Sequence, residues 1–129
     1  MLGLQRAERP ARVRKGVNVW ALNKEPRLKS LLLVLADYLG DADWTVDTSF
    51  RTSREAVYLM HRHEWELRAY LHLHGQAPGR VGLHLEYPAV EGSGSIYEAF
   101  DNLSLTQVID MLAAHFGISQ LRYPQSSGD

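Results

Sequence analysis

The chain has 129 residues, of which 45% are hydrophobic and 22% are charged, and this composition is typical of a globular domain and not of a disordered chain. It contains no cysteine, which excludes disulfide bonds, thiol nucleophiles and zinc sites with thiolate ligands. The formal net charge is −1, but residues 1–30 carry eight basic and two acidic side chains while the other 99 residues carry six and thirteen, so the two parts have net charges of +6 and −7.

The basic charge is concentrated at the start of the chain. Residues 1–16 have arginine at nearly alternate positions and little hydrophobic periodicity, so we predict a flexible basic arm there. A chain of this length buries one core, so we predict a single α+β domain for residues 17–118. The mainly polar residues 119–129 predict a C-terminal tail. The longest apolar run, residues 31–36, is too short to cross a bilayer, and we predict a soluble cytoplasmic protein that makes no membrane contact.

A short strand and a helix are the first predicted elements of the domain. Residues 17–22 predict a short edge strand. Pro26 suits the first turn of a helix, because its fixed φ fits there and its missing N–H is not needed. Leucines follow at helical spacing as far as Leu39, and Gly40 permits a left-handed stop. We therefore predict an amphipathic helix of about four turns.

Alternation of apolar and polar residues at period two predicts four strands in the middle of the chain. These strands are residues 44–50, 56–61, 66–74 and 80–87. Successive side chains of a strand point in opposite directions, so the third strand has its leucines on one face and Arg68, Tyr70 and His72 on the other. Aligning the apolar faces of neighbouring strands places Tyr58 opposite Arg68, and Tyr70 opposite His84.

The last part of the chain predicts a loop and a second helix. Pro88 is expected to end the fourth strand, and the glycine- and serine-rich residues 91–95 predict a flexible loop. Ser104 and Gln107 have the spacing of a capping box, and Gly117 supplies the stop. The apolar face of this helix is predicted to bury Leu105, Val108, Ile109, Leu112, Ala113 and Phe116.

The order α-β-β-β-β-α predicts a two-layer α+β fold, in which a four-stranded antiparallel meander sheet carries the N-terminal and C-terminal helices on one face. The other face of the sheet is then open. Aromatic residues, methionine and arginine, which are enriched where partner proteins dock, fall on this face. The predicted partner-binding residues are Tyr58, Met60, Trp65, Arg68, Tyr70, His72 and His84. We predict a non-catalytic protein–protein interaction module of the adaptor, chaperone or inhibitor/immunity type. A homodimer through the same face is the other interpretation of this surface.

Nucleic-acid binding is the first alternative function. The basic arm could neutralise phosphates through Arg6, Arg9, Arg12, Arg14 and Lys15. The helix–sheet–helix order is similar in outline to a double-stranded-RNA-binding domain, which implies a basic cluster at the start of the second helix. The second helix here has no lysine or arginine, and the acidic remainder of the chain repels phosphate.

A small enzyme or metal-binding protein is the second alternative, because the chain has six histidines. His72 and His84 are expected to lie diagonally on neighbouring strands and are the best pair. A metal needs a further ligand, and Glu86 is expected to form an ion pair with Arg68 instead. The sequence has no nucleophile elbow, P-loop or dinucleotide fingerprint. We therefore predict no catalytic residues, no metal and no cofactor.

Overall fold

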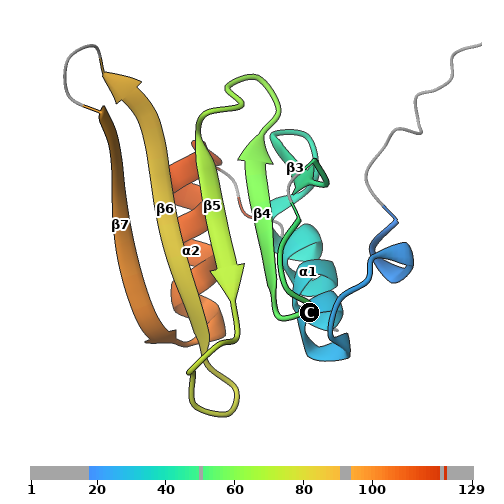
Figure 1. The fold of residues 1–129 in the computed structure, drawn as a ribbon. Helices are drawn as coiled ribbons and strands as arrows, with labels where there is room; N and C mark the ends of the chain where they lie inside the picture. Colours follow the sequence, from blue (N-terminus) through green and yellow to red (C-terminus); the bar gives the residue numbers. More distant parts are fainter. Residues whose placement is uncertain (1–17, 50, 91–93, 120, 122–129) are drawn as a thin grey trace, which may run out of the picture.

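A computed structural model describes residues 18–49, 51–90, 94–119 and 121 (Figure 1). The predicted basic arm lies outside these residues, as does nearly all of the predicted tail. The elements in chain order are η1 (Val19–Ala21), α1 (Pro26–Leu39), β3 (Trp44–Asp47), β4 (Ala56–His61), β5 (Arg68–His72), β6 (Val81–Val90), β7 (Gly94–Leu103) and α2 (Leu105–Phe116).

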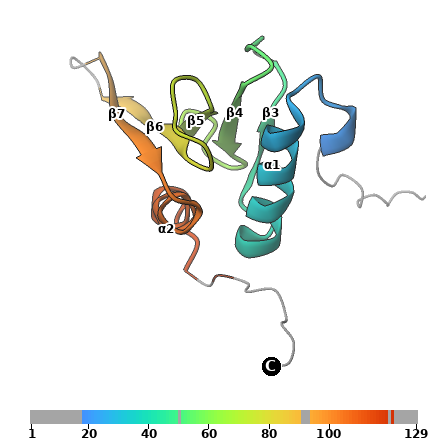
Figure 2. The same cartoon turned by 90° about the horizontal axis from the view of Figure 1, so that it is seen from below.

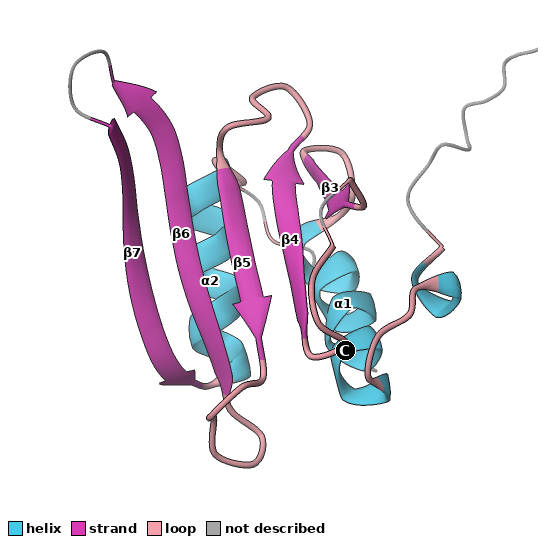
Figure 3. Cartoon of the chain, viewed as in Figure 1, coloured by secondary structure: helices cyan, strands magenta, loops and turns pink. Residues whose placement is uncertain are grey.

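The five strands form one antiparallel sheet in the order β3-β4-β5-β6-β7. Both helices lie on the same face of this sheet, α1 behind β3 and β4 and α2 behind β5 and β6 (Figures 2 and 3). The predicted α+β fold with an antiparallel meander is therefore confirmed, but the predicted number of four strands is wrong by one. None of the helices in the described ranges is long and apolar enough to cross a membrane.

Helix α1 begins and ends where the sequence predicts. Pro26 occupies the first turn, and the side chain of Glu25 accepts a hydrogen bond from the backbone N–H of Arg27 at 2.9 Å. Gly40 follows the helix with a φ of 70°, which is readily adopted only by glycine. The buried residues of the helix recur every three or four positions, so a single leucine stripe faces the sheet. They are Leu28, Leu32, Leu35 and Leu39.

Helix α2 has the predicted capping box at its start. The Ser104 hydroxyl accepts from the backbone N–H of Gln107, and the Gln107 side chain accepts from the backbone N–H of Ser104. Gly117 ends the helix in the left-handed conformation. Leu105 was predicted to be buried, and this is wrong: it is exposed. Leu105 is the first residue of the helix, and it lines a surface hollow beside Arg80 rather than the core.

Two local predictions are corrected. Residues 17–22 were predicted as an edge strand, but Val19–Ala21 is a 3-10 helix, whose first turn is held by the Asn18 side chain accepting from the backbone N–H of Trp20 at 3.1 Å. Pro88 was predicted to end the strand, but β6 continues to Val90, and a register shift between Tyr87 and Val90 accommodates the missing N–H.

Strand β7 was not predicted, because its start falls in the glycine- and serine-rich segment that favoured a loop. It pairs along most of its length with β6 and forms one edge of the sheet. Its pattern is weak because polar Glu98 lies opposite apolar Leu85, on the face that holds the helices. An edge strand is covered by fewer neighbours, so its side chains need not alternate strictly.

The register between β5 and β6 is as predicted, with Tyr70 opposite His84 and Arg68 opposite Glu86. The register between β4 and β5 differs from the prediction by two residues, since Tyr58 pairs with Tyr70 and not with Arg68. A shift of two residues keeps each side chain on its own face. The predicted sidedness of the sheet is therefore correct, and the leucines of all three central strands lie in the core. The fully buried leucines of the sheet are Leu59, Leu71 and Leu83.

Candidate binding surface

The face of the sheet opposite the two helices, which we call the outer face, is directed towards the reader in Figure 1. Five aromatic or imidazole rings cross it from β4 to β7. We call them the ring cluster, and its members are Tyr58, Tyr70, His72, His84 and Tyr97. The strands bring them together because residues directly opposite or diagonal in a sheet have neighbouring side chains.

The rings of the cluster contact one another in a continuous path. Tyr70 is at its centre, with ring centroids 5.0 Å from Tyr58, 5.5 Å from His72 and 5.3 Å from His84. The centroids of His72 and His84 are 5.3 Å apart, and those of His84 and Tyr97 are 5.8 Å apart. These separations lie in the range of favourable aromatic packing. The ring cluster is thus a preorganised surface whose side chains restrict one another.

An ion-pair network holds the β3 side of the ring cluster. Arg68 Nη2 lies 3.2 Å from Asp47 Oδ2, and Arg68 Nε lies 3.8 Å from Glu86 Oε1. The guanidinium carbon is 4.3 Å from the centroid of the Tyr58 ring, and the Tyr58 hydroxyl donates to Glu86 Oε2 at 2.9 Å. Burial, followed by the hydrogen bond to Glu86, raises the pKa of Tyr58 to about 12, so Tyr58 remains a neutral donor at physiological pH.

His72 is more enclosed than the sequence predicts, with only 8% of its surface exposed. It lies opposite Gly82 in the β5–β6 pair, and its ring occupies the space that a side chain at position 82 would need. Its Nδ1 has no hydrogen-bond partner in the described part of the chain. Burial, and then the nearby positive charges that His84 and His74 would carry, lower the pKa of His72. His72 is therefore a neutral, packed member of the outer face.

A second histidine is held neutral on the face that carries the helices. The Nε2 of His115 in α2 is 2.8 Å from the backbone oxygen of Arg68, and its ring centroid lies 4.9 Å from that of Tyr87. Burial lowers the pKa of His115 below its ordinary value.

We expect the two histidines to make the protein less stable in weak acid. Both pKa values are lowered in the folded state, so below about pH 6.5 the unfolded chain binds more protons than the folded chain. The free energy of unfolding should then decrease as the pH falls from 7.5 to 5.5. Urea unfolding at several pH values should show a smaller decrease for His72→Gln and for His115→Gln. His63→Gln, at an exposed position, is the control and should show the same decrease as the unmodified protein. If the free energy of unfolding of both test variants also decreased with pH as steeply as that of the unmodified protein, the expectation would be contradicted.

A hollow of about 390 Å³ lies at one end of the outer face. Two of its lining residues are strongly exposed aromatic side chains, Trp65 in the loop after β4 and Tyr97 in β7, which are 66% and 62% exposed. Arg68 and Glu86 of the ion-pair network also line it. We call this the Trp65–Tyr97 hollow, and the described residues that line it are Trp65, Glu66, Arg68, Glu86, Tyr87, Ala89 and Tyr97.

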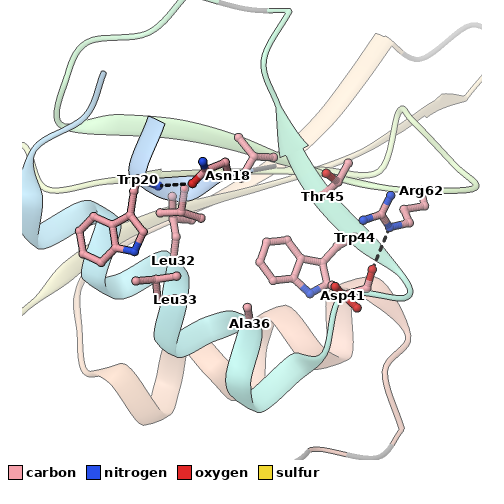
Figure 4. A pocket seen from close by; sticks show the side chains of 11 residues that line it. Asn18, Trp20, Leu32, Leu33, Ala36, Asp41, Trp44, Thr45 and Arg62 are labelled. Carbon is pink, nitrogen blue, oxygen red and sulfur yellow. Dashed lines mark hydrogen bonds between the residues drawn. The ribbon is translucent and has the colours of Figure 1, made fainter. Parts of the chain in front are cut away.

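A second cavity, of about 290 Å³, lies between η1, α1 and β3 (Figure 4). Trp20 and Trp44 lie at its two ends, and Leu33 and Ala36 of α1 lie between them. The Trp44 indole is fixed, since its Nε1 donates to the backbone oxygen of Gly40 at 2.6 Å. The lining is mostly apolar and has no charge pattern that would select a ligand, so the outer face is the better-defined candidate surface.

The structure places most of the predicted partner-binding residues together. Tyr58, Met60, Tyr70 and His84 are partly exposed on the outer face, and Trp65 lies at its end. His72 and Arg68 lie on the same face but are largely enclosed: the Arg68 side chain is 13% exposed and His72 is packed over Gly82. The structure therefore makes these two residues part of the support of the surface.

Sequence reasoning missed Tyr97 and Asp47. Tyr97 belongs to β7, whose signal was the short run of aromatic and aliphatic residues at positions 96–100. Asp47 is 6% exposed and pairs with Arg68 across the intervening strand β4. The predicted ion pair of Glu86 with Arg68 is present, although its separation is long.

The alternative functions gain little from this geometry. His72 and His84 converge as predicted, but the described residues contain no group of three or more histidines or carboxylates that could hold a metal ion. The arginines proposed to bind nucleic acid lie outside the described residues. Comparisons with protein-family models, with curated proteins and with solved structures found no match. The function is therefore inferred from the outer face itself.

Proposed function

We infer that the protein is a non-catalytic interaction module that docks another protein against the outer face of its sheet. The observation that carries this proposal is that the preorganised ring cluster, whose member Tyr97 is strongly exposed, borders the same hollow as a second strongly exposed aromatic side chain, Trp65. Isolated exposed aromatics are common on protein surfaces, but aromatics gathered beside a polar network are typical of docking sites.

The rigidity of the outer face supports docking. Tyr58 is restrained by its hydrogen bond to Glu86 and by the Arg68 guanidinium over its ring, and Tyr70 is packed between Tyr58 and His84. Side chains that are already ordered lose little conformational entropy on association. The surface can therefore bind a partner without first rearranging.

The charge of the body favours a protein partner over nucleic acid. Residues 31–129 carry a net charge of −7, which disfavours contact between the sheet and a phosphate backbone. Nucleic-acid binding would have to depend on the arm alone. A variant in which Arg6, Arg9, Arg12 and Arg14 are changed to glutamine should then lose nucleic acid while it keeps a protein partner.

Site-specific photo-crosslinking tests the proposed function. A photoreactive phenylalanine analogue at position 97 should form an adduct with another protein in cells of the natural source, whereas the same group at Asp110, an exposed position on α2, should not. The identified partner should then bind the purified protein at least tenfold more weakly after Tyr97→Ala, a factor that corresponds to about 1.4 kcal/mol. Asp110→Ala should leave the affinity unchanged.

Two results would overturn this proposal. Adducts that form at position 110 and not at position 97 would move the interface to the helical face. Adducts at position 97 that contain only a second copy of the same chain would make the outer face a homodimer interface.

A further inference from the structure

We propose that the Trp65–Tyr97 hollow is a binding site for an arginine side chain that the partner protein presents. This inference rests on the proposed docking of a protein to the outer face, and it adds the chemical group that the face receives. It depends on three properties of the hollow, which are its aromatic lining, its excess of carboxylates and its partly engaged Glu86.

The aromatic lining comes from two separate parts of the chain. Trp65 lies in the loop between β4 and β5, and Tyr97 lies in edge strand β7. Both side chains are more than half exposed, yet both border one hollow. The faces of tryptophan and tyrosine rings attract cations through the quadrupole of the ring. Two such rings around one hollow favour a ligand with a planar cationic group.

The charges in the hollow also favour a cation. Among the described lining residues the charged ones are Glu66, Glu86 and Arg68, and Arg68 already pairs with buried Asp47 at 3.2 Å. The guanidinium is therefore already paired with a carboxylate outside the lining, and the two glutamates of the lining leave an excess of negative charge. Glu66 is exposed and its side chain has no ion pair or hydrogen bond within the described residues. An anionic guest such as a phosphate would be repelled.

Glu86 has room for a second cation. Its Oε2 accepts from the Tyr58 hydroxyl at 2.9 Å, but its Oε1 is 3.8 Å from Arg68 Nε, which is longer than a hydrogen bond. That oxygen can therefore accept from an incoming N–H. Glu66 and Glu86 then offer acceptors, while the Trp65 and Tyr97 rings offer stacking surfaces.

Arginine satisfies this combination better than lysine. Its guanidinium is planar, so it can stack on an aromatic ring while its N–H groups donate in the plane to a carboxylate. The lysine ammonium is compact and strongly hydrated, so it gains less from a ring and from a planar array of acceptors. The hollow should accordingly prefer arginine over lysine and should reject citrulline, which has the same shape without the charge.

The direct test is an NMR titration of the isotopically labelled full chain with three probes: N-acetyl-arginine amide, N-acetyl-lysine amide and N-acetyl-citrulline amide. The arginine probe should shift the indole N–H signal of Trp65 and the amide of Tyr97, with a dissociation constant on the order of 10 mM. The lysine probe should bind several-fold more weakly, and the citrulline probe should produce no saturable shift.

Matched variants assign the effect to the hollow. Glu66→Gln should weaken the arginine probe at least threefold without affecting folding, because the Glu66 side chain has no partner to lose among the described residues. Glu64→Gln, at a neighbouring exposed carboxylate outside the hollow, should have no effect. Trp65→Ala should abolish binding, and Trp20→Ala, at an equally exposed tryptophan elsewhere, should not.

Several outcomes would overturn the inference. Equal shifts with arginine and citrulline would remove the role of charge, and an unchanged affinity in Glu66→Gln would remove the carboxylate. The chain's own arm is a rival source of arginine. If glutamine at positions 6, 9, 12 and 14 shifts the Trp65 signal before any probe is added, the arm and not a partner fills the hollow.

This inference and the proposed function can fail separately. If a partner is crosslinked at position 97 but its affinity is unchanged by Glu66→Gln, the outer face docks a protein and the hollow does not take an arginine. If the arginine probe binds as expected but no partner is crosslinked at position 97, the hollow is a cation site and the docking proposal fails.

Discussion

Arg68→Met should lower the free energy of unfolding by about 3–5 kcal/mol, as expected when one partner of a buried ion pair is removed. Asp47 is only 6% exposed, and after the substitution its carboxylate would keep the hydrogen bonds from Ser49 but lose the guanidinium at 3.2 Å. Glu86 would lose the same cation. Urea unfolding at pH 7 measures the effect.

The control for this prediction is Arg62→Met. Arg62 is exposed and its Nε donates to the backbone oxygen of Asp41, so its replacement should change stability by no more than about 0.5 kcal/mol. Adding Asp47→Asn to Arg68→Met should recover part of the loss, because it removes the unpaired buried charge. A single Arg68 variant as stable as the Arg62 control would show that the network contributes nothing.

Gly82→Ala should destabilise the protein by about 1–3 kcal/mol, the range expected when a well-packed site receives an extra methyl group. A β-carbon at position 82 would overlap the imidazole of His72, and that ring is bordered by the rings of Tyr70, His74 and His84. The ring must therefore leave its place over β6. Thermal or urea unfolding would measure the loss.

A double-mutant cycle identifies His72 as the cause of this loss. In the background of His72→Ala the space over position 82 is empty, so Gly82→Ala should then be nearly neutral or stabilising. The same cost in both backgrounds would mean that the added methyl group clashes with something other than His72. The cycle also tests whether the ring cluster is packed as described, since His72 can block position 82 only from that place.

Much of the fold was predictable because local signals and burial agree. The leucine spacing of α1 specifies a helix with one buried face. The capping box at Ser104 and the stop at Gly117 specify the two ends of α2 through groups that are close in the sequence. The β5–β6 register was also predictable, because Gly75 and Gly79, both with positive φ, mark the turn between these strands. Residues 62–67, which connect β4 to β5, contain no glycine or proline to mark the turn, and two registers that differ by two residues bury the same leucines.

The features that escaped prediction depend on strands that are distant in the sequence or weakly patterned. The central tyrosines could be assigned to the outer face from alternation alone. The burial of His72 could not, because it depends on a glycine ten positions later in the neighbouring strand. The pairing of Asp47 with Arg68 spans β4, and Tyr97 requires strand β7, whose first residues resemble a linker. Each of these features is nevertheless central to the candidate surface.

The order of the strands has a consequence for how the protein forms during its synthesis. Every pairing in the sheet joins a strand to the one that follows it in the chain, so each new strand finds its partner among residues that have just left the ribosome. Loops that close over short distances cost little entropy, and proteins dominated by such contacts fold quickly for their stability. Strand β3 therefore pairs with β4, the next strand in the chain, and needs no strand from later in the sequence. The outer face is complete only when β7, the last strand to be synthesised, joins the sheet.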